Sequence, residues 1–214
     1  MDDDFAEDAP PRSPAATLRM IEEQRAAAAR LVNPDARIYY WPWGFAWLIS
    51  FTVFFLRYGP DGRVFVDLPG WLPFVVMITL ILAAGAVAGI GSARAYRHIE
   101  GDSSRRGLYY GLSWSIGFAS LFTVAGRITE YVPDDLQGLL WAGIAVGLTG
   151  VLHMAGGAIF LDRYLFALGL WISVINMAGI FVGPGWHSLI VAVLGGGGMI
   201  VAGSVLARRQ RASR

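Results

Sequence analysis

His153 and Asn176 are the most polar side chains within otherwise apolar stretches, and here the sequence comes closest to chemistry. On a helix, His153 shares a face with Thr149, and Asn176 shares a face with Ser173. Because a polar group in lipid is costly unless paired, we expect these two faces to meet. One interpretation is an interhelical hydrogen bond worth about 1 kcal/mol. The other is a proton-sensitive or solute-contacting site, since histidine titrates near neutral pH.

A run of four glycines near the end of the chain allows two interpretations. The run consists of Gly195, Gly196, Gly197 and Gly198. Each glycine costs a helix about 1 kcal/mol relative to alanine, so neighbours must support this segment. In the first interpretation the helix is broken, and its freed backbone groups bind a solute. In the second, the glycines form a smooth groove for bulky side chains such as Trp47, Trp114 or Trp171.

Residue types argue against catalysis. The sequence has no cysteine, which removes disulfides, thiolate ligands and thiol nucleophiles. The apolar stretches lack carboxylates, on which most hydrolytic metal sites and proton relays depend. The topology derived below places His98 inside, His153 within the membrane and His187 at the outer surface. We therefore predict no enzyme activity, no catalytic residues, no metal site and no cofactor.

Four charged residues gather near one predicted membrane boundary. They are Arg127, Glu130, Asp134 and Asp135, and the first two are three positions apart. We interpret them as an outer rim of solvated interfacial charge.

Composition and length of the apolar stretches predict the fold class. The chain of 214 residues is 55% hydrophobic, above the roughly 45 to 50% that is usual for soluble domains. Six windows approach the length of about 20 residues that a membrane-spanning helix needs. They are Tyr40–Leu56, Trp71–Gly91, Leu108–Gly126, Leu139–Leu161, Tyr164–Phe181 and His187–Leu206. We predict an all-α, polytopic transmembrane bundle of six helices.

Arginines orient this bundle. All 17 basic residues are arginine, and a cytoplasmic N-terminus places 14 of them inside and three outside. This split satisfies the positive-inside rule, so we predict both termini in the cytoplasm and location in the cell membrane. The resulting units are a cytoplasmic segment, 1–38, a transmembrane domain, 39–207, and a basic tail, 208–214. The tail is short and begins where a helix ends, so nucleic-acid binding does not follow.

The N-terminal segment contains a short predicted helix. Ser13-Pro14 is typical of a helix start and Asn33-Pro34 of its end. Leu18 and Ile21 begin a thin apolar stripe along it. The helix lies either on the membrane surface or against a cytoplasmic protein partner.

Pairs of glycines four apart let helices approach closely in lipid. They occur at Gly85/Gly89, Gly143/Gly147 and Gly179/Gly183, and Gly150 and Gly157 extend the second pair. Such stripes serve packing within one chain or a homo-oligomer. A shift of 67 positions also aligns Gly44 with Gly111 and Trp47 with Trp114, which indicates either repeated helical hairpins or chance.

Several short stretches resemble a family of actinobacterial six-span integral membrane proteins, some loosely labelled transporters. The resemblance rests on Ile21–Arg25, Tyr40–Gly44, Pro133–Leu136, His153–Gly157 and Gly183–Ser188. It implies a membrane location and supplies no functional residues.

Two functions fit these observations. The first is a transporter-like protein in the lipid bilayer that moves or senses a small solute. The second is a non-transporting accessory, sensory or regulatory subunit. A continuous polar path between His153, Asn176 and the four glycines would favour transport, whereas a dry core would favour the subunit.

Overall fold

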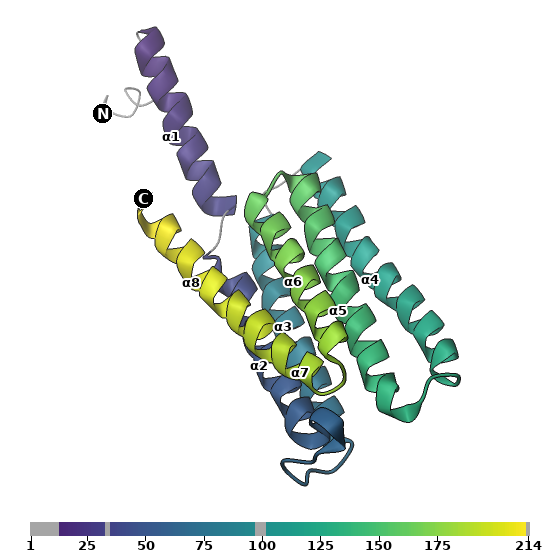
Figure 1. Cartoon of the computed structure of the whole chain (residues 1–214). Coiled ribbons are helices and arrows are strands. Elements are labelled where there is room, and N and C mark those ends of the chain that lie inside the picture. Colours follow the sequence, from purple (N-terminus) through teal and green to yellow (C-terminus); the bar gives the residue numbers. More distant parts are fainter. Residues whose placement is uncertain (1–12, 33–34, 97–101, 213–214) are drawn as a thin grey trace.

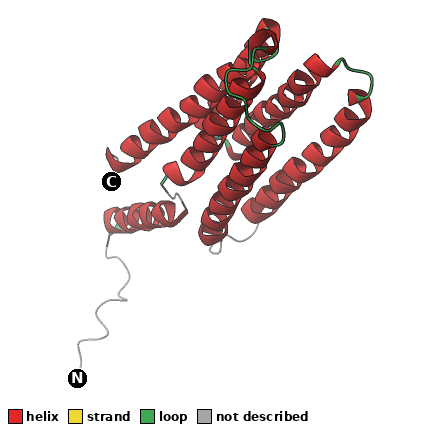
Figure 2. Ribbon diagram, turned by 90° about the horizontal axis from the view of Figure 1, so that it is seen from below, coloured by secondary structure: helices red, strands yellow, loops and turns green. Residues whose placement is uncertain are grey.

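A computed structural model describes residues 13–32, 35–96, 102–212, and their regular structure is helical (Figures 1 and 2). The helices are α1 (Pro14–Val32), α2 (Arg37–Tyr58), η1 (Pro60–Gly62), α3 (Leu72–Tyr96), α4 (Asp102–Thr129), α5 (Asp134–Phe160), α6 (Arg163–Val182), α7 (Trp186–Ile190), η2 (Val191–Gly196) and α8 (Gly197–Ala212). The segment η2 is a π-helix, and it joins α7 to α8 in one long helical stretch. The predicted all-α class is confirmed.

Five helical stretches are long and apolar enough to cross a membrane, which suggests a multi-pass membrane protein. They are Leu72–Ala93, Ser104–Thr129, Asp134–Phe160, Arg163–Val182 and Trp186–Ala212. The remaining predicted window, Tyr40–Leu56, is the first in sequence and lies within α2. This helix has 22 residues but is not among the five. The start of α2 is rich in tyrosine and tryptophan and includes Pro42, and these residue types lower its mean hydropathy. Tyrosine and tryptophan nevertheless suit a membrane interface.

The order in which the helices contact one another differs from their order in sequence. α5 packs along α6 and also along α4, while α2 packs along α3 and along η2 and α8. The stretch from α7 to α8 contacts both α6 and α2, so it joins the two groups. α3 packs chiefly along α2, and α4 chiefly along α5. Only 6% of the most apolar window of each is buried, against 33% to 39% for the three other spans.

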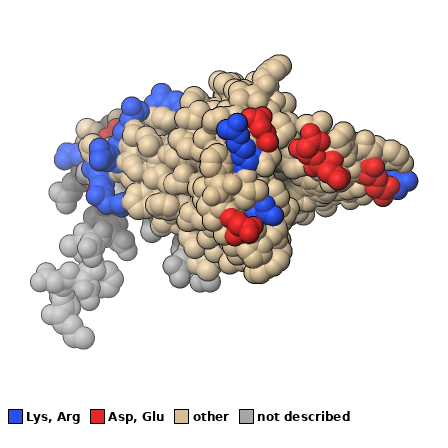
Figure 3. Space-filling view, turned by 60° about the horizontal axis from the view of Figure 1, so that its bottom comes forward, with Lys and Arg blue, Asp and Glu red and all other residues tan. Residues whose placement is uncertain are grey.

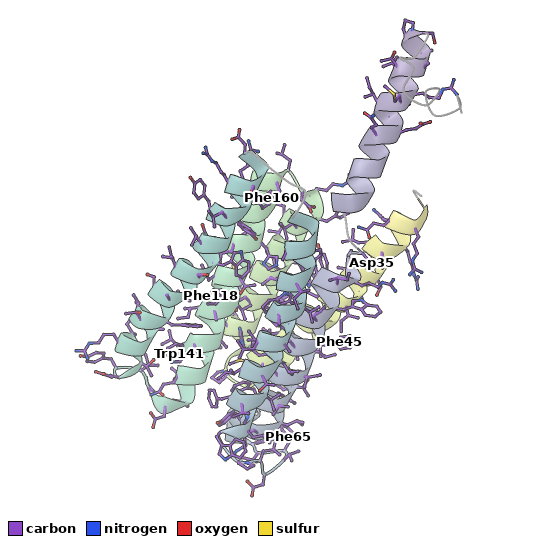
Figure 4. The ribbon with its side chains drawn as sticks, turned by 180° about the vertical axis from the view of Figure 1, so that it is seen from behind. Asp35, Phe45, Phe65, Phe118, Trp141 and Phe160 are labelled. Atoms are coloured by element: carbon purple, nitrogen blue, oxygen red, sulfur yellow. The ribbon has the colours of Figure 1, made fainter. Side chains whose placement is uncertain are left out.

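The core forms where the last helical stretch meets α2, α5 and α6. Its buried side chains include Trp47, Phe51, Val146, Ile172 and Val191. A second aromatic layer joins α4 to α5. Tyr110 contacts Phe160, and Phe122 contacts Trp141. Figure 4 labels Phe118, Trp141 and Phe160 in this layer.

The turn after α2 and the turn before α7 contact each other at the end of the bundle that carries Phe65 in Figure 4. Gly59 and Gly185 both have positive φ, 45° and 80°, which side chains disfavour. A Cβ atom on Gly185 would lie 2.3 Å from the carbonyl oxygen of Gly59. The turn before α7 therefore rests backbone against backbone on the turn after α2.

Charged side chains collect at the two ends of the bundle, with a broad uncharged surface between them (Figure 3). α1 stands away from the bundle, and its apolar residues Leu18, Met20 and Ile21 are exposed. This arrangement leaves both earlier interpretations of the N-terminal helix open.

Candidate functional site

Two of the buried polar side chains, Asn176 and His187, form one network between α5, α6 and α7. Asn176 donates from Nδ2 to the carbonyl oxygen of Gly143, 2.8 Å away. Its Oδ1 lies 2.8 Å from Nε2 of His187 and accepts that hydrogen bond. Asn176 is 6% exposed and His187 is 1% exposed. The nitrogen and the oxygen of the asparagine side chain are thus both hydrogen-bonded, and they connect α6 to α5 and to α7.

The partner of Asn176 is therefore His187, whereas the sequence led us to expect His153. His187 is buried within the protein, near the start of the last apolar stretch. Gly179, about one helical turn after Asn176 on α6, makes room for His187. A Cβ atom at Gly179 would lie 2.8 Å from the imidazole of His187. The missing side chain leaves room for the ring to fold in against α6. The pair Gly179 and His187, separated by a Gly-Pro-Gly turn, is the signal that sequence reasoning missed.

His153 lies in a different environment, toward α4. Its Nδ1 is 2.8 Å from the carbonyl oxygen of Thr149, so this nitrogen carries the proton and donates. Its ring stands edge-on to Trp114, with centroids 5.1 Å apart. Thr149 and Ser173 donate to carbonyl groups of their own helices, at 2.9 Å each. The structure thus gives each of these predicted site residues a local partner and shows no hydrogen bond from His153 to Asn176.

The four glycines are helical, so the broken helix expected in one interpretation is not formed. Gly195 and Gly196 close the π-helix η2, and Gly197 and Gly198 open α8. A π-helical turn is wider than an α-turn, and it often marks a place where another group inserts. Here Trp171 donates from Nε1 to the carbonyl oxygen of Leu194 at 2.9 Å.

The glycines also form the groove of the second interpretation. A Cβ atom on Gly195 would lie 3.1 Å from the ring of Trp47. One on Gly196 would lie 2.5 Å from the backbone nitrogen of Leu48 and 2.7 Å from the carbonyl oxygen of Gly44. Trp47 therefore occupies the groove as anticipated, while Trp114 lies against His153.

The glycine stripe of α5 is occupied by α6. A Cβ atom on Gly150 would lie 2.3 Å from Oγ of Ser173, and one on Gly157 would lie 2.5 Å from the backbone nitrogen of Phe166. At Gly85 a Cβ atom would meet nothing within 4 Å. The α5 stripe thus serves packing within the chain.

The outer rim does not converge into a site. Arg127 donates to Glu130 at 2.9 Å, and both side chains are largely exposed. Asp134 accepts from Gln137 at 3.0 Å, and Asp135 lies beside it in the first turn of α5. Within the part of the chain that the structure describes, no three histidine or carboxylate groups are placed to hold a metal ion. His98 lies outside the described residues.

The outer face of α4 carries a pattern that the sequence reasoning did not single out. Its members are spaced three and four apart over three heptads: Arg106, Tyr109, Ser113, Ile116, Ser120, Thr123 and Arg127. All seven are exposed. The face toward α5 instead presents Tyr110, Trp114 and Ala125. We call the seven residues the α4 seam.

No protein-family model, curated protein or solved structure matches this chain. What it does must therefore be inferred from its own residues and contacts.

Proposed function

We propose that this protein is a non-transporting subunit of the cell membrane that acts by association, and that its first partner is a second copy of itself. In this proposal α2 is a sixth span, and both termini lie in the cytoplasm. The 14 arginines on one predicted side and three on the other support that orientation.

The buried polar groups support a subunit over a transporter. A solute path would need polar groups that are free to change partners. Instead, Asn176 is bonded to Gly143 and His187, and His153 is bonded to Thr149. Backbone of α2 and the ring of Trp47 pack against the glycine run. These contacts hold most of the buried polar groups within the fold, and the buried hydroxyl of Ser50 in α2 has no hydrogen-bond partner among the described residues.

The α4 seam carries the proposal. Polar residues of a membrane-spanning helix normally face protein or water, yet this seam is exposed although α4 is long and apolar enough to span. A repeat of three and four residues is the spacing of a left-handed helix pair. Small residues at Ser113 and Ser120, seven apart, permit close approach of two backbones in lipid.

Charged residues flank the seam at both of its ends. One end carries Asp102 and Arg106, four apart, and the other carries Arg127 and Glu130, three apart. Each end thus holds both signs. A second copy inserted in the same orientation would place its α4 parallel to this one, with charges of both signs facing each other at both ends.

Cysteine cross-linking tests this association, and the natural chain contains no cysteine to interfere. Single cysteines would replace Ser113, Ile116 and Ser120 on the seam. Ser115 and Gly111 are controls, because they are exposed and lie roughly 120° or more around α4 from the centre of the seam. Under oxidation in native membranes we expect disulfide-linked dimers from the seam positions only, since a disulfide requires Cα atoms within about 7 Å.

Dimers at seam and control positions alike, or at neither, would overturn the association. Cross-links to a protein of another mass would replace the second copy by a different subunit. In the same series, Thr149→Cys reports on the core, because Thr149 is buried. A water-soluble thiol reagent should leave that cysteine unmodified from either side. Its modification would indicate a solute path and contradict a non-transporting role.

A further inference from the structure

Two arginines converge on one tyrosine at the arginine-rich end of the bundle. Nη2 of Arg163 and Nη1 of Arg209 each donate to Oη of Tyr164 at 2.9 Å. Arg163 is the first residue of α6, and Arg209 lies in the last turn of α8. Arg163 and Tyr164 are neighbours in sequence, whereas Arg209 reaches the same tyrosine from α8, 45 positions further along the chain.

Neither guanidinium has a carboxylate partner among the residues that the structure describes, where the ion pairs are Arg37 with Asp35 and Arg127 with Glu130. The adjacent acid, Asp162, caps α6: its Oδ1 accepts from the backbone nitrogens of Tyr164 and Leu165, at 2.9 and 3.1 Å.

Two like charges held near one neutral oxygen leave most of their hydrogen-bonding capacity unused. A guanidinium has five N–H donors, and the bonds to Tyr164 use one from each arginine. Both guanidinium carbons also lie near the tyrosine ring, 4.8 and 6.0 Å from its centroid. The ring thus gives both cations a common surface. The phenol accepts from both arginines and keeps its own O–H to donate.

We propose that Arg163, Tyr164 and Arg209 bind a phosphate group, supplied by the headgroup of an anionic phospholipid. Planar guanidinium groups match the paired oxygens of a phosphate, and two of them around one phenol offer several donors to a single anion. This inference rests on the proposed membrane location, because the cluster lies where two candidate spans reach their boundary. It is independent of dimer formation through α4.

Thermal melting of the purified full chain in neutral detergent tests the site. Three additions are compared: phosphatidylglycerol, phosphatidylcholine and inorganic phosphate. We expect phosphatidylglycerol to raise the melting temperature, because a ligand that binds only the folded state stabilises it. Arg163→Gln with Arg209→Gln should weaken the apparent affinity about tenfold or more, since both charge-assisted sets of hydrogen bonds to the phosphate are lost. Tyr164→Phe should weaken it less.

A charge-matched double variant provides the control. Arg208→Gln with Arg211→Gln removes two charges from the same helix end, at exposed positions outside the cluster. It should keep most of the response to phosphatidylglycerol. Equal loss in both double variants would reduce the effect to net charge and overturn the site. A response to inorganic phosphate at similar concentration would overturn the lipid as the source. If neither phosphatidylglycerol nor inorganic phosphate changed the melting temperature of the natural chain, binding would be overturned altogether.

Discussion

At the scale of single residues, this fold depends on where side chains are missing. Gly196 and Gly197 are neighbours in sequence, yet their surroundings differ. A Cβ atom on Gly196 would meet backbone atoms of α2, whereas one on Gly197 would meet nothing within 4 Å. Backbone cannot move aside as a flexible side chain can, so only the first glycine is required by packing.

Alanine at these two positions should therefore have opposite effects. Gly196→Ala should destabilise the protein by about 1 to 3 kcal/mol through overpacking against Leu48. Gly197→Ala should be neutral or stabilising by up to about 1 kcal/mol, because alanine is the better helix former. Melting temperatures of the two purified variants check this. Similar destabilisation by both would contradict the assigned packing.

The buried network shows how far residue types alone could predict the site. A polar residue in an apolar stretch needs a partner, and that reasoning singled out Asn176 as a residue that must be bonded. It did not identify His187, because helical periodicity compares residues on one helix. The contact depends on a turn that reverses the chain and on space left by Gly179. Such tertiary information is not present in spacing along one helix.

At the scale of elements, α2 and α8 are joined near the arginine-rich end. The backbone nitrogen of Ala36 donates to Gln210, and Trp41 donates from Nε1 to the carbonyl oxygen of Ile200 at 3.2 Å. Asp35, labelled in Figure 4, lies at this junction and accepts hydrogen bonds from Arg37. The Arg37 bond lowers the pKa of Asp35 from 3.8 to about 2.

This pKa predicts a modest dependence of stability on pH. The folded chain has the lower pKa, so the contribution is present above about pH 4 and is lost as the pH falls toward 2. Because both side chains are about a third exposed, we expect Asp35→Asn to cost only about 0.5 kcal/mol. The melting difference from the natural chain should vanish near pH 2. Asp67→Asn, in the exposed loop after α2, is the control, and an equal cost from it would contradict the assignment.

The spans themselves were predictable because lipid imposes a length and an apolar composition on each helix. Five of the six predicted windows correspond to apolar helices, with ends displaced by several residues. The displacement has local causes. α5 begins directly after Pro133, and Asp162 fixes the start of α6. The packing order of the helices was not predictable, since apolar stripes do not specify which neighbour covers them.

At the scale of the whole molecule, the number of crossings determines on which sides α1 and the first loop lie. If α2 spans the membrane, Leu18 in α1 and Val64 in the loop after α2 lie on opposite sides. If it does not, they share a side. Both residues are exposed, at 61% and 49%, so introduced cysteines can be labelled there.

We expect a membrane-impermeant thiol reagent on intact cells to label Val64→Cys and to spare Leu18→Cys. Ala212→Cys, in the exposed last turn of α8, should behave like Leu18→Cys. Labelling of both Leu18→Cys and Val64→Cys from outside would leave five spans and place the N-terminus outside.

The position of the last helical stretch has a consequence for biogenesis. α2 and α3 form one packed group, and α4, α5 and α6 form another, while the segment from Trp186 onward contacts both. The bond from Trp41 to Ile200 spans 159 positions of sequence. Because synthesis runs from the N-terminus, the segment that covers one face of α2 is the last to be made. A chain that stops before Trp186 would lack the segment that contacts both groups, and the face of α2 that packs against this segment would stay uncovered.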